Sequence, residues 1–301
     1  MSLPTVDTSV IGSYPYSINT LEIMRQYFSQ ESTDKWHEII SSAVNDMVQT
    51  GISIISDGQT RDPFIQLFTR KLNGCRIRAR TEIVDTITYA GPITVKDQRY
   101  VRSLLPSNTR LKGVITGPWT LTCSCVDMFY NDNQKVAFDF AEVLAQEAKN
   151  LEAYVDFISI DEPFFSQDIP DYALDLITML TKDVRKPVIL HVCGDITQII
   201  PKIIELPVDI LSHEFKASPQ LLTEFNKYSF PQNLCLGSVR SDHIRVESVD
   251  EILKHIHEAF ELFGEKIIHI APDCGQRLLP RSVAMNKLQN LVDAGDLFNA
   301  R

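Results

Sequence analysis

The chain has 301 residues, of which 44% are hydrophobic and 23% are charged, so it can bury a substantial core and is neither disordered nor fibrous. Its 29 Lys and Arg residues against 39 Asp and Glu residues give a formal net charge of -10, which repels phosphate backbones and anionic lipid head groups. We therefore expect neither nucleic acids nor membranes as partners.

Residues 1–17 lack the basic start and the long apolar run of a secretory signal. No stretch reaches the roughly 18 consecutive apolar residues that a membrane-spanning helix needs. We therefore expect a cytoplasmic protein. Its six cysteines are too few and too irregularly spaced for a disulfide framework, so some of them are candidate metal ligands.

Short apolar or β-branched runs recur along the chain, and each is followed by a longer segment with helical periodicity. Most runs are apolar throughout, as expected of strands that are covered on both faces. We predict eight strands, at residues 9–13, 53–57, 112–116, 157–161, 188–193, 209–214, 234–239 and 267–272. Helices are predicted at residues 35–49, 134–154, 171–181, 219–226, 249–263 and 283–294, with a short polar tail after the last of them.

Eight strand–helix units predict a closed (β/α)8 barrel, a TIM barrel, that occupies residues 1–301 as one catalytic unit. An open, doubly wound sheet is the alternative, but the first strand runs into IGSYP and not into a glycine-rich dinucleotide turn. Residues 76–101 interrupt the rhythm, because RIRARTEIVDTITY alternates as a β-hairpin does. We interpret them as a hairpin inserted between the second and third units.

Polar side chains concentrate at the carboxyl ends of the predicted strands, where barrels of this kind carry their chemistry. The fifth strand ends in LHVCGD, the sixth in SHEF and the eighth in APDCG. His191 and Cys193 are two apart on a strand, so both point to the same side. With Glu214 and Cys274 they form a set that suits tetrahedral zinc. Taken singly, each cysteine is more typical of a small buried hydrophobe than of a metal ligand.

Cys123 and Cys125 have the same spacing, and we interpret them as a structural pair of thiols near the barrel mouth. The fourth strand ends in Asp161 and Glu162, two adjacent acids that could bind a substrate ammonium, act in proton transfer or simply cap a turn. Asp161 and Asp57 are the acids that we expect to face the pocket.

The motifs TSVIGSYP, IDEP, HVCGD, SHEF and PDCG, in this order, resemble the cobalamin-independent methionine synthase family, in particular its C-terminal catalytic barrel. The resemblance runs from Thr8 to about Ala294 and places the chain in the broader uroporphyrinogen decarboxylase/methionine synthase superfamily. It implies a zinc site that binds a thiol substrate, homocysteine. The family's zinc ligands correspond to His191, Cys193, Glu214 and Cys274.

The resemblance also implies the substrate contacts. The IGS turn implicates Ile11 and Ser13 in binding the amino-acid portion of homocysteine, and the aspartate of IDEP implicates Asp161 in binding its ammonium group. Gln59 stands where the family has an acidic residue, and it can still accept a hydrogen bond. The family's proton-donating histidine aligns loosely with Asp242 or His243.

The methyl donor is less clearly implied. Folate-using members carry a tryptophan that stacks on the pterin, whereas this chain has Ser124 at that position, and they have a second, N-terminal barrel. The chain resembles the short, single-barrel members, so we expect a methylated corrinoid protein or a pterin carrier and not a folate polyglutamate. The implied activity is a zinc-dependent thiol methyltransferase that forms methionine.

Three alternatives stay open. A related zinc methyltransferase could use another thiol, such as coenzyme M, with a corrinoid donor, although Asp161 suits an ammonium better than a sulfonate. A decarboxylase of the uroporphyrinogen type would need no metal. A non-catalytic barrel could hold zinc for structure or dock to a corrinoid carrier. Hydrolysis is disfavoured, because water-activating zinc sites more often have neutral imidazole ligands than two thiolates and a carboxylate.

Overall fold

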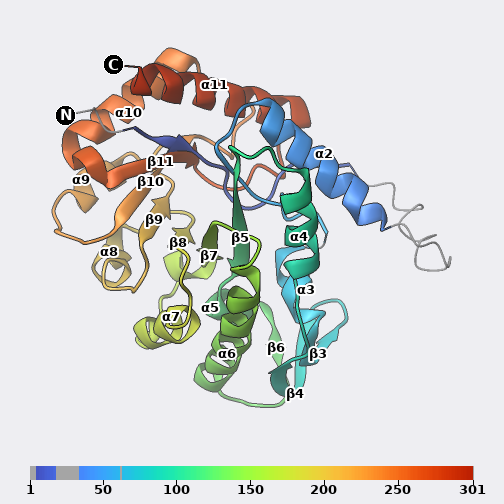
Figure 1. Cartoon of the computed structure of the whole chain (residues 1–301). Helices are drawn as coiled ribbons and strands as arrows, with labels where there is room; N and C mark the ends of the chain where they lie inside the picture. Colours follow the sequence, from blue (N-terminus) through green and yellow to red (C-terminus); the bar gives the residue numbers. More distant parts are fainter. Residues whose placement is uncertain (1–4, 18–33, 62, 301) are drawn as a thin grey trace.

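Eight parallel strands form a nearly closed barrel in the computed structural model, which describes residues 5–17, 34–61 and 63–300 (Figure 1). The strands, in their order around the sheet, are β1 (Asp7–Thr8), β11 (Ile267–Pro272), β10 (Asn233–Val239), β9 (Ile210–His213), β8 (Val188–Val192), β7 (Phe157–Asp161), β5 (Arg110–Thr116) and β2 (Ile54–Ile55). The two edges meet where Ser9 bridges Ile54 and the Val10 amide donates to the Ile54 carbonyl at 3.2 Å. The predicted (β/α)8 fold is confirmed.

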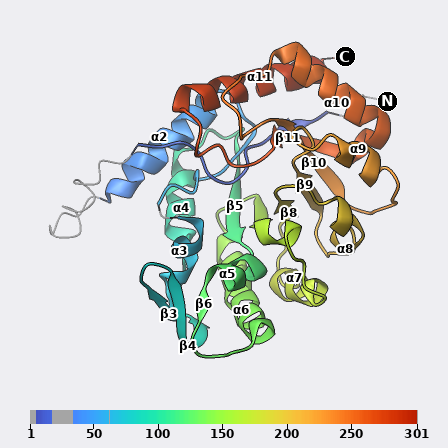
Figure 2. The same ribbon diagram turned by 180° about the vertical axis from the view of Figure 1, so that it is seen from behind.

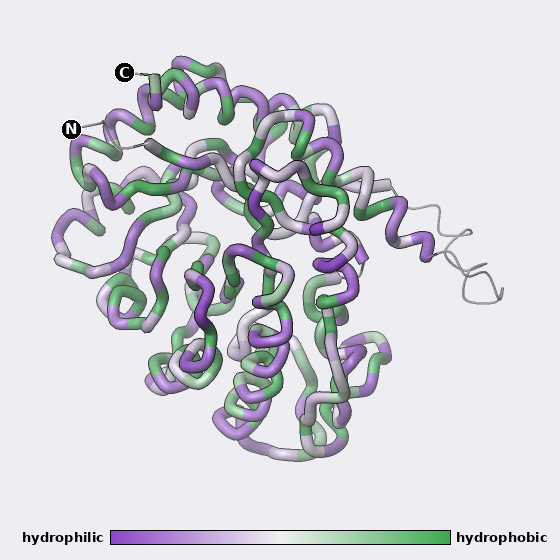
Figure 3. The backbone as a smooth tube through the Cα atoms, in the orientation of Figure 1, coloured by the Kyte–Doolittle hydropathy of each residue, from purple (hydrophilic) through white to green (hydrophobic). Residues whose placement is uncertain are grey.

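Helices surround the barrel, as the two opposite views show (Figures 1 and 2). Along them the tube alternates between hydrophobic and hydrophilic residues (Figure 3), the pattern of helices that bury one face. α10 spans Val249–Phe263, as predicted, and Ser248 directly before it forms a reciprocal capping box with Glu251. The helices are α2 (Lys35–Gln49), α3 (Phe64–Thr69), α4 (Val95–Leu104), α5 (Pro118–Ser124), α6 (Asn133–Leu151), α7 (Ala173–Thr181), α8 (Ile200–Ile203), α9 (Gln220–Phe225), α10 (Val249–Phe263) and α11 (Arg281–Asn299).

The predicted hairpin lies between β2 and β5, but its bounds differ from residues 76–101. β3 (Leu72–Ile77) pairs antiparallel with β4 (Thr81–Tyr89), and the short β6 (Val126–Asp127) joins β4 in parallel. The alternation ends at Tyr89 because the following segment switches to helical spacing and forms α4. Gly74 has φ of +79°, and a Cβ there would lie 2.4 Å from the Thr86 carbonyl, so only glycine fits this irregular pairing.

Both ends of the described chain also differ from the prediction. β1 stops at Thr8, earlier than the predicted strand over residues 9–13, because Gly12 adopts φ of +46° and turns the backbone. α11 continues to Asn299, where a polar tail was expected. Asn299 accepts from the Val6 amide at 2.8 Å and donates to the Val6 carbonyl at 3.0 Å, so the last turn of α11 is fixed to the start of the barrel.

No helix in the described ranges is long and apolar enough to cross a membrane. Two packed layers form the core, one between strands and helices and a smaller one inside the barrel. The barrel interior also holds Lys112, whose fully buried ammonium donates to the Ser9 hydroxyl at 3.2 Å and to the Val10 carbonyl. This lysine therefore fixes the segment that leads from β1 into the IGS turn.

A buried ion pair ties the loop after β10 to the outer helix α11. Lys287 Nζ lies 2.7 Å from Glu247 Oε2, and both side chains are almost completely shielded from solvent. The other Glu247 oxygen accepts from the Arg240 amide at 3.0 Å. The pair thus fixes the loop over residues 240–247 in place.

We predict that Lys287→Met lowers the free energy of unfolding by about 3 kcal/mol, because it leaves the Glu247 carboxylate buried without its cation. Urea titration followed by circular dichroism measures the change. The matched control is Lys254→Met, which breaks the exposed Lys254–Glu258 pair (3.6 Å) and is expected to cost less than about 0.5 kcal/mol. Equal stabilities of the two variants would contradict the role given to the buried pair.

Candidate active site

A cavity of about 380 Å³ opens at the carboxyl ends of the strands. It gathers residues that are far apart in the sequence, since parallel strands all end at the same rim. Phe64, Pro163 and Leu278 supply apolar surface, and Arg277 adds a cation. Among its lining residues are seven of the predicted site residues, namely Ile11, Ser13, Gln59, Asp161, His191, Cys193 and Cys274.

An imidazole and two thiols converge at one wall of this cavity. His191 Nε2 lies 3.1 Å from Cys193 Sγ, which in turn lies 2.9 Å from Cys274 Sγ. All three ligand atoms fall within 4.8 Å of one another, close enough to share one metal ion. His191 Nδ1 contacts the Ser212 hydroxyl at 3.2 Å, which orients the ring with Nε2 toward the thiols.

The electrostatics of this group suit a cation. Burial lowers the pKa of His191 to about 3, so its ring is neutral and able to ligate. The hydrogen bond with Cys274, together with burial, raises the pKa of the Cys193 thiol, and burial raises the pKa of Glu214. Buried groups that resist ionisation in this way become stable anions beside a positive ion. The mixture of sulfur and imidazole donors fits zinc.

Glu214 lies beside the three-residue group and not within it. It follows β9, is half-buried, and lies close to the Gly194 amide and the Cys274 thiol, both of which act to lower its pKa against the effect of burial. Glu214 and Cys274 both line an adjoining cavity of about 250 Å³, which Asp242 borders as well. The structure therefore brings three of the four predicted ligands together and places the fourth next to Cys274.

Ser241, which sequence reasoning missed, anchors Cys274. Its hydroxyl donates to the Cys274 carbonyl at 2.6 Å and accepts from the Cys274 amide at 3.0 Å. The only signal in the sequence was a hydroxyl residue two positions after a strand. Such a reciprocal contact fixes the backbone of the turn and with it the direction of the thiol.

The IGS turn forms the next wall, and Gly12 is essential to it. A Cβ on Gly12 would lie 3.1 Å from Gln59 Oε1 and 3.4 Å from Asp161 Oδ2, so glycine lets these two side chains approach the turn. Gln59 itself has φ of +44° and donates its amide to Asp57 Oδ1 at 3.0 Å. Asp57 therefore shapes this turn and does not line the cavity as expected. Ser159 donates to Asp161 Oδ1 at 3.1 Å.

The adjacent acids Asp161 and Glu162 have separate roles. Glu162 is fully buried away from the cavity and accepts from the amides of Trp119 and Thr120 at 2.9 and 2.8 Å, at the start of α5. A Cβ on Gly117 would lie 2.2 Å from Glu162 Cδ, so glycine is required there. The capping interpretation holds for Glu162, whereas Asp161 faces the cavity.

The remaining predicted residues lie outside the main cavity. Asp242 is exposed and pairs with Arg240 at 2.6 Å, and His243 lines neither cavity but accepts from the Arg245 amide at 2.9 Å. Cys123 and Cys125 are half-buried and do not belong to the group around His191.

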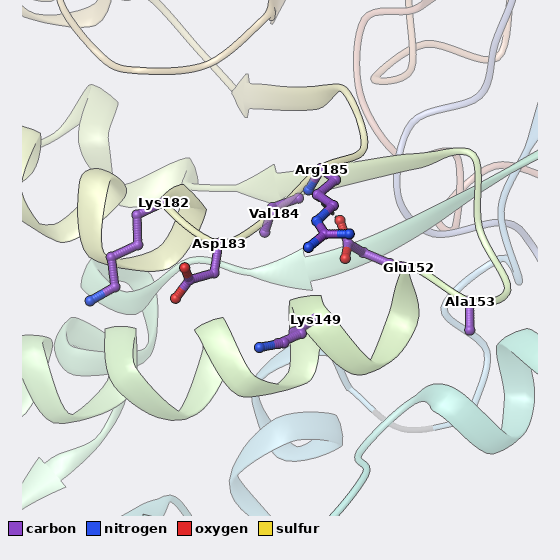
Figure 4. Close-up of a pocket in the computed structure, with 7 residues that line it drawn as sticks. All are labelled: Lys149, Glu152, Ala153, Lys182, Asp183, Val184 and Arg185. Atoms are coloured by element: carbon purple, nitrogen blue, oxygen red, sulfur yellow. Dashed lines mark hydrogen bonds between the residues drawn. The ribbon is translucent and has the colours of Figure 1, made fainter.

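A further pocket, of about 590 Å³, lies at the opposite end of the barrel (Figure 4). It is formed by the end of α6 and by the segment that precedes β8. Glu152 crosses it to accept from the Lys186 amide at 3.1 Å, and Lys149, Lys182 and Arg185 surround it. None of the predicted site residues lines it. The chemistry therefore belongs to the other end.

Comparison with known proteins places this geometry in a family. The family model for the catalytic domain of cobalamin-independent synthase matches residues 6–296. The chain belongs to the cobalamin-independent methionine synthase family. It is accordingly a methyltransferase of that family, and the resemblance inferred from its motifs is confirmed.

Similar members of the cobalamin-independent methionine synthase family come from archaea. A methionine synthase of Methanocaldococcus jannaschii is 35% identical over 311 residues, which cover 97% of this chain and 99% of that protein. A methionine synthase of Methanothermobacter thermautotrophicus is 36% identical, covering 95% and 98%. Among solved structures, a B12-independent methionine synthase from Shewanella sp. W3-18-1 in complex with selenomethionine shares the fold, with a TM-score of 0.83, 22% identity and 98% coverage of each chain.

We predict that Cys193→Ser and Cys274→Ser bind zinc more than about 100-fold more weakly than the unaltered protein, because loss of a ligand should exceed the loss typical of its supporting residues. Zinc content after dialysis against a competing chelator, measured by elemental analysis, provides the readout. Cys123→Ser removes a thiol outside the group and is expected to keep its zinc. Retention of zinc by all three variants would reject the ligand assignment.

Proposed function

We propose that the chain is a zinc-dependent methyltransferase that moves a methyl group onto the thiol of homocysteine to form methionine. The observation that carries this proposal is one cavity in which the His191, Cys193 and Cys274 group shares its walls with Asp161 and Ser13. A small amino thiol requires two features of its binding site: a soft metal ion that binds the sulfur and a carboxylate that binds the ammonium group. Membership of the family supports the same activity.

His191, Cys193, Glu214 and Cys274 would hold the zinc ion. When bound, zinc lowers the pKa of a thiol that reaches it and so supplies a thiolate nucleophile near neutral pH. Ser212 and Ser241 fix the directions of His191 and Cys274 through the hydrogen bonds described above. These supports keep the donor atoms converged before substrate arrives.

Asp161 is proposed to bind the substrate ammonium. Burial raises its pKa to about 6, while the nearby Lys112 ammonium and the Ser159 hydroxyl act in the opposite direction and favour the carboxylate. Gln59 Oε1 lies on the same side of the IGS turn and can accept a second hydrogen bond from the ammonium. Ile11 and Leu278 add apolar surface to the cavity that receives the substrate.

In the transfer, the substrate thiol has lost its proton, a sulfur–carbon bond forms, and the bond between the methyl group and its donor breaks. A pterin donor would leave with a lone pair on nitrogen that needs a proton, and we propose Asp242 or His243, in the loop that follows β10, for this step. A methylated corrinoid protein would need no such proton. The donor is proposed to be one of these two classes and not a folate polyglutamate.

Coenzyme M is the second candidate substrate, because Arg277 gives the cavity a cation that a sulfonate could use. Against it, coenzyme M has no ammonium and would leave the half-buried Asp161 carboxylate without a cation from the substrate. Homocysteine provides that cation.

We predict that zinc-loaded protein methylates homocysteine with kcat/KM more than about 100-fold above that for coenzyme M, because coenzyme M brings no cation to the half-buried Asp161 carboxylate. Methylcobalamin, methyltetrahydrofolate and methyltetrahydropterins serve as donors, and mass spectrometry detects the products. Asp161→Asn is expected to raise KM for homocysteine about tenfold or more and to leave that for coenzyme M unchanged. A preference for coenzyme M would overturn the proposed substrate.

A further inference from the structure

Arg277 lies in the wall of the cavity formed by the turn that follows β11. The Gln276 amide donates to the Ser13 carbonyl at 2.7 Å, and a Cβ on Gly275 would lie 2.7 Å from Ser13 Oγ. This turn is therefore packed against the IGS turn, and Arg277 and Ser13 line the same cavity. Asp161 comes from β7, which is separated from β11 by three strands around the sheet, so it reaches the cavity from a different wall.

The Arg277 guanidinium is half-buried, and an aromatic side chain holds it in place instead of a carboxylate. It stacks 4.6 Å from the centre of the Tyr16 ring and donates one N–H to the Tyr16 hydroxyl. Within the described ranges no carboxylate forms an ion pair with it, and burial lowers its pKa with no acid acting against that shift. By contrast, Arg281 donates to both oxygens of Asp46 at 2.6 Å.

A partly desolvated guanidinium in a binding cavity is costly unless an anion arrives to pair with it. One of its five N–H donors is used by Tyr16, which leaves a planar fork whose geometry matches a carboxylate. The aromatic contact fixes this fork before any ligand binds. The cavity thus presents one fixed cation and, at another wall, the Asp161 carboxylate.

We propose that Arg277 is a specificity-determining residue that binds the α-carboxylate of the amino-acid substrate. A ligand with an ammonium and a carboxylate on the same carbon satisfies Asp161 and Arg277 together, whereas a simple amine, a simple acid or a sulfonate satisfies only one of them. The inference rests on the proposed function and extends it, because it assigns the residue that distinguishes an amino acid from a plain amino thiol.

The test compares two ligands that differ only in the carboxylate, L-homocysteine and 3-aminopropane-1-thiol. Titration calorimetry with the zinc-loaded protein is expected to show homocysteine binding about 10- to 100-fold more tightly, the range for hydrogen bonds to a charged group. In Arg277→Met this difference falls to less than about threefold, because homocysteine binding weakens and binding of the amine is unchanged. Arg277→Lys, which keeps the charge but loses the fork, is expected to be intermediate.

Arg99→Met is the matched control, since it removes an exposed arginine on α4 that lines no part of the cavity. It should retain the full discrimination. Circular dichroism checks that each variant is folded. If Arg277→Met does not fold, Arg277→Lys provides the second variant for the test.

The outcomes separate the two proposals. Unchanged discrimination in a folded Arg277→Met protein would overturn the role of Arg277 and leave the proposed substrate intact. Failure of the unaltered protein to bind either amino thiol would overturn the proposed function and this inference with it. A loss of coenzyme M affinity greater than the loss for homocysteine would assign Arg277 to a sulfonate instead.

Discussion

The parallel direction of all eight strands is the constraint on which the site depends. Because every strand ends at the same rim, short motifs separated by tens of residues meet around one cavity. His191 lies in β8 and Cys193 directly follows it, Glu214 directly follows β9, and the turn after β11 carries Cys274. The convergence of His191, Cys193 and Cys274 is thus a consequence of strand direction and of the residue types at the strand ends.

Contacts behind the site convert this rough convergence into a fixed arrangement. Ser241 holds both backbone groups of Cys274, and the Lys287–Glu247 pair fixes the loop that carries Ser241 to α11. Lys112 performs a similar function under the IGS turn, where it holds the Val10 carbonyl. Buried charges are expensive, and here they are placed where loops would otherwise be free to move.

The barrel and the closeness of His191, Cys193 and Cys274 could be predicted from the sequence because their signals are local. Apolar runs mark the strands, and the spacing of His191 and Cys193 marks a shared side. Features that depend on long-range partners could not be predicted. The contact between Ser241 and Cys274 spans 33 residues, and the Arg277 guanidinium is held by Tyr16, 261 positions earlier in the chain. The predicted strand over residues 9–13 was wrong because the left-handed turn at Gly12 outweighs the apolar pattern around it.

The central claim is that these side chains hold an ion that takes up the substrate sulfur. X-ray absorption at the zinc edge, recorded on the zinc-loaded protein before and after addition of L-homocysteine, tests it most directly. The account predicts nitrogen, oxygen and sulfur ligands before addition and one more sulfur in the ligand shell afterwards. A ligand shell that is identical in both spectra would contradict it.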